Sequence, residues 1–370
     1  MSAAQALTAN AVAPSTFLGC HHLELYVGNT RQASHYYQSA CGFEPVAHSG
    51  LTTGARDDDA IALRQGDIRI LLKSALHPDA PSAEYVRRHG EGVYDVALEV
   101  LDAQAVFERA VEGGATAIHP PAADEDDFGS VVRATIGTPG PVRHTLVQRN
   151  GYSGPFLPGF KPIAGGPPVR PVGLRCVDHV AFSLQPGSLQ QWVDFYGGTF
   201  GFQQTRAEET VTSHSGMASR VMEDLSGRVK FPLTEPTIGK RKSQIEEYLH
   251  FNNGPGAQHA ALGSDDVIGS VRALRAAGIK FLRTPGTYYD LLRARVGDID
   301  EDCAALRELS ILVDRDPGGY LLQIFTEPLD SRPTFFLEII QRKGATGFGS
   351  GNIRALFEAV EREQALRGNL

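Results

Sequence analysis

The 370-residue sequence is poor in cysteine, and the few cysteines it has are widely separated. No CxxC pair is present, and the four positions are Cys20, Cys41, Cys176 and Cys303. This spacing argues against a zinc cluster and against a disulfide framework. A chain without structural disulfides is typical of a reducing compartment, so the sequence predicts a cytoplasmic protein.

Long apolar runs and an excess of positive charge are also missing. No stretch of about 18 apolar residues occurs, so no membrane span is predicted. Lys and Arg number 35 against 43 Asp and Glu, a formal net charge of −8, which argues against a nucleic-acid partner. Residues 1–14 lack the basic and then apolar pattern of a signal peptide. We therefore expect them to form a disordered leader.

What the sequence does contain is an internal repeat. His22 opens the segment HLELYV and His179 opens HVAFSL. Both segments alternate at period two, as a strand with one buried face does. Each is followed by a helical segment rich in aromatic residues, which ends near Gly42 in the first case and near Gly201 in the second. Glycine at these positions is a normal helix stop.

Two further matches fix the register of the repeat. Asp95 opens the strand DVALEV, and His259 opens HAALGS. Thr145 in TLVQRNG matches Glu338 in EIIQRKG. The chain is thus predicted to consist of two homologous halves, each with two units of a strand, a helix and further strands. A segment dense in proline and glycine joins the halves.

The repeat also indicates where the chemistry lies. At the three matched positions the second half has two imidazoles and a carboxylate, on His179, His259 and Glu338. The first half lacks the second imidazole and the carboxylate, as expected after duplication and loss of one site. Two His and one carboxylate form the facial set of non-haem iron(II) oxygenases, which leaves coordination positions open for substrate and O₂. Zinc enzymes use similar donors, so the donor types alone leave the metal open.

The alternative is that these side chains are structural. A single histidine on an amphipathic strand is more often a packed or surface residue than a ligand. Glu338 is harder to explain in this way, because it lies within the apolar segment FFLEII. An unpaired carboxylate there would be costly, and a bound metal compensates that cost.

The motifs of the second half resemble those of the 4-hydroxyphenylpyruvate dioxygenase family, within the vicinal-oxygen-chelate superfamily. The matching segments are KSQIEEYL at 242–249, GAQH at 256–259, TYYD at 287–290, GYLLQIFT at 319–326, RPTFFLEIIQR at 332–342, GFGSGN at 347–352 and RGNL at 367–370. The first half matches more loosely, best at RHTLV (143–147) and GYSGPFLPG (151–159). The resemblance covers nearly the whole chain.

The resemblance implies a fold and an organisation. The fold is α+β, of the vicinal-oxygen-chelate (glyoxalase- and bleomycin-resistance-like) type, with four βαβββ modules in two open-barrel domains and a C-terminal lid helix. After the leader at 1–14 we expect a metal-free N-terminal domain at 15–156, a linker at 157–171 and a catalytic domain at 172–370. A homo-oligomer, dimer or tetramer, is also expected.

The resemblance further implies the reaction and the residues. Iron(II) would lie on His179, His259 and Glu338, and the substrates would be an aryl 2-oxo acid and O₂. Oxidative decarboxylation of 4-hydroxyphenylpyruvate, ring hydroxylation and side-chain migration would give homogentisate. The expected catalytic polar residues are Ser219, Gln244, Gln258, Gln323 and Asn352. The expected substrate-binding residues are Pro232, Thr234, Phe325, Phe336, Phe348 and Ile353.

Two of these positions depart from the family pattern and keep alternatives open. Thr234 stands where the family usually has Asn, and Ile353 stands where it usually has Phe. Isoleucine at the second position is typical of the sister enzyme 4-hydroxymandelate synthase, which hydroxylates the benzylic carbon of the same substrate. The alternatives are therefore that synthase, a dioxygenase for another aryl 2-oxo acid, and a non-enzymatic metal-binding module.

Overall fold

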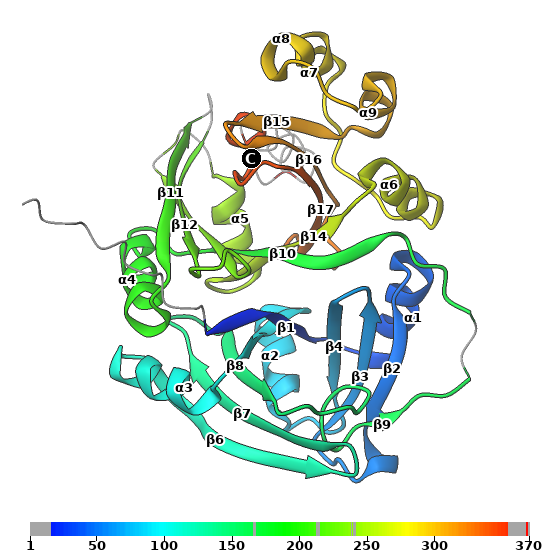
Figure 1. Ribbon diagram of the computed structural model, residues 1–370, viewed down its shortest axis with the longest axis vertical. Coiled ribbons are helices and arrows are strands. Elements are labelled where there is room, and N and C mark those ends of the chain that lie inside the picture. The colour runs from blue at the N-terminus through cyan, green and yellow to red at the C-terminus, as the bar shows by residue number, and fades with distance from the viewer. Residues whose placement is uncertain are drawn as a thin grey trace, which may run out of the picture.

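The computed structural model describes residues 16–165, 168–211, 215–237, 239, 242–353 and 368. The first half forms one curved mixed sheet (Figure 1). Its strands are β1 (Phe17–Tyr26), β2 (Glu44–Ser49), β3 (Asp58–Gln65), β4 (Ile68–Ala75), β5 (Gly92–Val100), β6 (Thr116–Asp126), β7 (Gly129–Gly137), β8 (Arg143–Arg149) and β9 (Lys161–Pro162). They are arranged in the order β6-β7-β8-β5-β1-β4-β3-β2-β9.

The second half forms a second curved sheet beside the first (Figure 1). Its strands are β10 (Leu174–Ser183), β11 (Gln203–Val211), β12 (Gly216–Glu223), β13 (Lys230–Thr237), β14 (Gly256–Ser264), β15 (Leu312–Asp316), β16 (Gly319–Phe325) and β17 (Phe336–Lys343). Their order is β11-β12-β13-β10-β14-β17-β16-β15. Read in the opposite direction, and apart from the short β9, the first sheet has the same order.

Helices connect the strands into four βαβββ modules. The helices are α1 (Thr30–Cys41), α2 (Pro81–His89), α3 (Ala103–Glu112), α4 (Leu189–Phe200), α5 (Gln244–Phe251), α6 (Val267–Ala276), α7 (Gly286–Asp290), α8 (Leu292–Val296) and α9 (Cys303–Leu309), with a short 3₁₀ turn at Leu51–Thr53. Each module starts with one strand, continues with a helix and closes with three strands, the last of which runs parallel to the first. The predicted fold is therefore confirmed.

The strand registers show that the repeat is accurate to the residue. His179 pairs with Ala261, and His22 pairs with Ala97, which stands at the same place in the first sheet. Helix ends repeat as well. Gly42 and Gly201 follow α1 and α4 with left-handed φ values of 72° and 68°, a conformation that glycine adopts without steric cost.

The alternation of side chains along β1 and β10 divides each sheet into two faces. One face of each strand carries large apolar residues, such as Leu23 and Leu25 on β1 and Val180 and Phe182 on β10, and these belong to one core shared by both halves. The other face lies on the concave side of each sheet. Because the convex faces share the core, each half keeps a concave surface available for a site.

Three further expectations concern the ends of the chain and its surroundings. Within the described residues, no helix is both long and apolar enough to cross a membrane. The expected leader at 1–14 lies outside the described residues. The expected C-terminal helix is described only where it begins, at residues 350–353, and the rest of it lies outside them.

Candidate metal centre

Three neighbouring strands of the second sheet bring the predicted ligands together. His179 lies on β10, His259 on β14 and Glu338 on β17. Ala261 pairs with His179 on one side and with Glu338 on the other, so these three residues form one row across the sheet. His259 lies two residues before Ala261 on the same face. The methyl group of alanine at the centre of this set leaves room for an ion between the donors.

The donor atoms converge on one point. One ligand atom from each of the three residues lies within 4.8 Å of the other two. The Nε2 atoms of His179 and His259 are 3.2 Å and 3.5 Å from Oε2 of Glu338. All three side chains are largely buried. The distances and burial are those of a compact metal site, so the repeat in the sequence selected the right three residues to meet in space.

The electrostatics of the triad are those of a carboxylate held between two bases. Burial alone would raise the pKa of Glu338, but the two imidazoles lower it to about 2. Burial disfavours the charged form of His179, yet Glu338 and Asp178 raise its pKa above the ordinary value. Burial lowers the pKa of His259. The ionised carboxylate is the form of Glu338 that ligates a divalent cation.

Neighbouring side chains orient both imidazoles. Nδ1 of His179 lies 2.8 Å from a carboxylate oxygen of Asp178, and Nδ1 of His259 lies 3.2 Å from Oε1 of Gln258. An ionised carboxylate only accepts, so Nδ1 of His179 carries the proton and Nε2 presents its lone pair to the site.

Most of the predicted pocket residues line one cavity with the three ligands. The predicted members of this wall are Ser219, Pro232, Thr234, Gln244, Gln258, Gln323, Phe325, Phe348 and Ile353. Helix α5 supplies Gln244, and it lies within the curve of the second sheet (Figure 1). Residues that the motifs did not single out complete the wall, namely Ala181, Arg206, Glu208, Met217, Val221 and Ile245. Four of them lie on β11 and β12 at alternate positions, namely Arg206, Glu208, Met217 and Val221, and Ala181 and Ile245 lie on β10 and α5.

Two polar groups of this wall differ in their availability to a bound molecule. Oε1 of Gln323 is buried without a hydrogen-bond partner among the described residues. Buried acceptors are normally paired, so Gln323 faces the cavity with a group ready for a ligand. The hydroxyl of Thr234, by contrast, donates to the carbonyl of Phe182 at 3.0 Å. Its proton is therefore already used within the protein.

Two predicted residues lie next to the cavity wall and not in it. Phe336 stacks on the ring of His259 at 4.9 Å with an interplanar angle of 21°, so it touches the site through a ligand. Asn352 is fully buried, and its Oδ1 accepts from the hydroxyl of Tyr288 at 2.6 Å. Asn352 thus ties the start of the C-terminal helix to α7.

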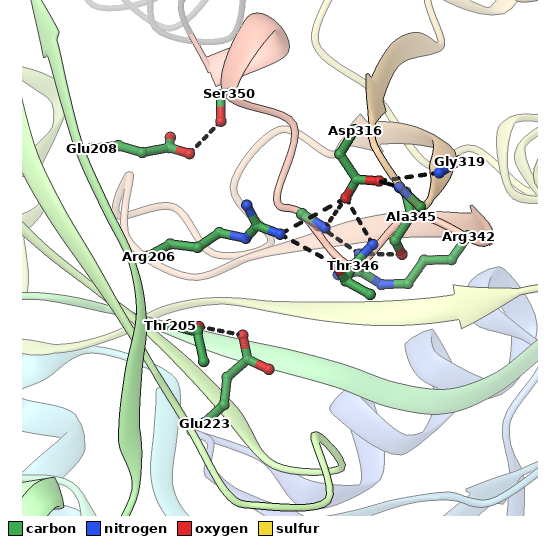
Figure 2. Close-up of polar contacts among 12 residues, drawn as sticks. Thr205, Arg206, Glu208, Glu223, Asp316, Gly319, Arg342, Ala345, Thr346 and Ser350 are labelled. Atoms are coloured by element: carbon green, nitrogen blue, oxygen red, sulfur yellow. Dashed lines mark hydrogen bonds and ion pairs between the residues drawn. The ribbon is translucent and has the colours of Figure 1, made fainter.

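The loop that carries Phe348 is held by charged residues from three strands. Arg342 on β17 donates to the carbonyls of Ala345 and Gly347. Asp316 on β15 accepts from the backbone of Thr346 at 2.9 Å and from that of Gly347 at 2.7 Å. Figure 2 shows these contacts, with Arg206 reaching the same loop from β11. The ring of Phe348 lies 5.1 Å from that of His179, so the loop places an aromatic wall beside the metal site.

Family models match both halves of the chain. The model described as "Hydroxyphenylpyruvate dioxygenase, HPPD, N-terminal" matches residues 13–139. The model of the glyoxalase, bleomycin resistance protein and dioxygenase superfamily matches residues 177–324.

Similar proteins of known name extend over nearly the full length. The chain is 41% identical to the 4-hydroxyphenylpyruvate dioxygenase of Yarrowia lipolytica over 96% of this chain and 94% of that protein. It is also 41% identical to that of Danio rerio, over 96% and 92%. Among solved structures, a mutant of 4-hydroxymandelate synthase from Streptomyces coelicolor superposes with a TM-score of 0.86 at 39% identity, covering 94% of this chain and 99% of the other.

Proposed function

Because this chain belongs to the 4-hydroxyphenylpyruvate dioxygenase family, we propose that it converts 4-hydroxyphenylpyruvate and O₂ to homogentisate and CO₂. One oxygen atom enters the ring and the other enters the new carboxylate, while the side chain migrates. The substrate's own 2-oxo acid supplies the electrons. The observation that carries the proposal is the buried triad of His179, His259 and Glu338 at the base of a cavity with aromatic and amide walls.

The triad fits iron(II). Two imidazole nitrogens and one carboxylate oxygen form a facial set that suits iron(II) and leaves positions for a chelating substrate and for O₂. When bound, iron(II) would supply the redox chemistry with O₂ and the Lewis acidity toward the 2-oxo acid. The chain contributes the geometry of these donors and the exclusion of water around them.

The cavity wall provides the rest of the recognition. Phe325 and Phe348 line the cavity and offer ring faces and edges to an aromatic substrate, an arrangement that aromatic pairs favour. The unpaired Oε1 of Gln323, or its amide nitrogen in the flipped assignment, meets a polar group of the substrate. Gln244, at the start of α5, and Ser219, on β12, place further polar groups in the same wall.

Product analysis tests the proposal. The protein is incubated with iron(II), air and 4-hydroxyphenylpyruvate, and the products are separated by chromatography. We expect homogentisate as the main product, with oxygen uptake that matches it. No uptake and no turnover of any aryl 2-oxo acid would leave a metal-binding module as the better description.

A second candidate, 4-hydroxymandelate synthase, is favoured by one observation. Ile353 lines the cavity and packs near Met217 and Ile245, at the position where the synthase typically has isoleucine. The structural similarity to a 4-hydroxymandelate synthase mutant is in line with this. The same chromatogram separates the two candidates, because the synthase would give 4-hydroxymandelate as its only product. The oligomeric state and a cytoplasmic location stay predictions.

A further inference from the structure

A buried ion pair stands directly behind the metal site. Both carboxylate oxygens of Asp178 contact the guanidinium of Arg342, at 2.7 Å and 2.8 Å. One of these oxygens also accepts from Nδ1 of His179 at 2.8 Å. Asp178 is on β10 and Arg342 is on β17, so the pair spans the strand between them. A two-pronged pair of this kind fixes direction as well as distance.

A local irregularity of β10 makes the contact possible. The pairing of β10 with β14 shifts between Val177 and His179, which leaves Asp178 as the extra residue of a bulge. Bulges commonly redirect a side chain next to an active site. Without the shift, neighbouring residues of a strand would point to opposite faces, and Asp178 could not reach Nδ1 of the residue that follows it.

The same arginine reaches the loop that walls the cavity. Arg342 donates to the carbonyls of Ala345 and Gly347 (Figure 2). Its guanidinium also lies 5.3 Å from the ring centre of Phe348. One side chain therefore contacts both the carboxylate that orients a metal ligand and the loop that carries an aromatic wall residue.

The first half of the chain has an equivalent arginine that keeps the contact with its loop and, within the part of the chain that the structure describes, lacks the contact with a carboxylate. Arg149 stands at the position of Arg342, four residues after the third matched position, and it donates to the carbonyl of Tyr152 and lies over its ring. The bulge is also kept, but its extra residue is His21. Among the described residues, Arg149 forms no ion pair with a carboxylate. The half without the metal triad has thus kept the arginine that closes the loop and lacks the aspartate.

We propose that Asp178 and Arg342 are a positioning pair for the metal centre, an inference that rests on the proposed function. Asp178 fixes the proton of His179 on Nδ1 and directs Nε2 at the ion. Arg342 holds Asp178 and, through the same guanidinium, fixes the Phe348 loop relative to that ligand. Mutation of a carboxylate that orients a metal-binding histidine typically weakens metal affinity about 10- to 100-fold.

Cobalt(II) is a suitable probe, because its visible spectrum reports on ligand geometry without turnover. The protein is loaded with cobalt(II) without air, and the rate of metal loss to a chelator is measured. We expect Asp178→Ala to lose cobalt(II) about 10- to 100-fold faster than the parent, with a changed visible spectrum. Arg342→Lys keeps one positive charge but loses the two-pronged contact, so we expect a smaller acceleration and a similar change in the spectrum.

Arg149→Lys is the matched control, since it alters the equivalent loop in the half without the triad. It should leave the rate and the spectrum unchanged. Parental rates and spectra in Asp178→Ala would overturn the proposal. If Asp178→Ala does not fold, Asp178→Asn is tested instead, because it keeps the shape of the side chain. We expect Asp178→Asn to lose metal about tenfold faster than the parent, and a parental rate would overturn the proposal. Failure of the unaltered protein to bind one cobalt(II) would instead reject the proposed metal centre.

Discussion

The two halves of this molecule share a backbone plan and differ in what lies on their concave faces. Strand order, parallel closing strands, the bulge before the first histidine and the glycine stops after α1 and α4 occur in both. The conserved features all serve the backbone or the shared core. The metal triad, in contrast, depends on three side chains that make no contribution to that core, so one half could lose it without losing its fold.

The difference is clearest around the first histidine of each half. Phe348 lies 5.1 Å from His179, and Phe156 lies 5.1 Å from His22, both edge-on. Around His22, however, Phe156 and Leu157 pack against the sheet, and Nδ1 of His22 lies 2.7 Å from Nδ1 of His21. Burial lowers the pKa of His22 to about 3, and this imidazole has lost its carboxylate partner. A histidine at the right register is therefore insufficient for a site.

The largest effect is expected when the second half is converted toward the first. Glu338→Thr places in the triad the residue that the first half has at Thr145. The two imidazoles alone form an incomplete facial set, so bound metal should fall to background and turnover should be abolished, while the fold is kept. Metal analysis and oxygen uptake measure both.

Thr145→Ala is the control for this exchange. It removes the hydroxyl that contacts Asp95 in the first half, where the described residues form no metal triad. Metal content and turnover should remain those of the parent. Normal metal content in Glu338→Thr would show that the carboxylate is not a ligand.

The next effect concerns the joint between the halves and its pH dependence. His144 is buried, contacts the hydroxyl of Tyr196 from the other half at 2.9 Å, and stands where the second half has Leu337. Burial lowers its pKa from the ordinary value of 6.5 to about 4. The unfolded chain then takes up a proton below pH 6.5 and the folded protein does not, so stability is complete above pH 6.5 and falls toward pH 4.

This shift corresponds to about 3 kcal/mol at its full extent. We expect His144→Gln to have a smaller loss of stability between pH 7 and pH 5 than the parent, measured as urea midpoints in the same metal state. His35→Gln, on the exposed side of α1, is the control and should keep the parental pH dependence. Equal pH dependence in parent and His144→Gln would show that this imidazole is not responsible.

How much of this was predictable follows from the same comparison. The alternation of HLELYV and HVAFSL was enough to predict the two strands, because burial of large apolar side chains dictates such a pattern. The expectation of a single buried face was wrong, since the residues of both segments are buried on both faces. The three positions that the repeat matched predicted the triad, because in the second half they carry His179, His259 and Glu338, and these three side chains lie together in the structure. The boundaries at 156 and 172 stay predictions.

Other parts of the site could not be predicted. The contact of Asp178 with Arg342 joins residues far apart in the chain through a bulge, and bulges leave no reliable pattern in a single sequence. The hydroxyl of Thr234 was expected in the polar wall, but its proton goes to the backbone of Phe182. The position of Asn352 beside Tyr288 depended on side-chain packing, which the motif alone does not specify.

A steric change at the centre of the triad is expected to have a moderate effect. Ala261 is the small residue between His179 and Glu338, and Ala97 is its counterpart beneath Phe156. Overfilling a packed site costs about 1–3 kcal/mol, so Leu should lower stability at either position. Only Ala261→Leu should also weaken metal binding, about ten- to a hundredfold, because its side chain competes with the ion. Similar metal affinity in both variants would place the ion elsewhere.

The smallest effect concerns the two departures in the cavity wall, and it distinguishes the product. Ile353 has less bulk than Phe and packs near Met217 and Ile245, which leaves the substrate ring more room on that side. The hydroxyl of Thr234 donates its hydrogen bond to the carbonyl of Phe182. Thr234 therefore holds the phenol of a substrate less firmly than an asparagine amide would. A hydrogen bond of this kind contributes about 0.5–1.5 kcal/mol, roughly a factor of two to ten. That is enough to shift a product ratio and too little to remove the parent activity.

We therefore expect homogentisate with a detectable fraction of 4-hydroxymandelate in the parent. The fraction should fall in Ile353→Phe and fall further when Thr234→Asn is added, with each step within the same two- to tenfold range. Chromatography of the products of the three proteins measures it. If 4-hydroxymandelate were the only product of the parent, these two side chains would define a synthase, and the same exchanges should then raise homogentisate from zero.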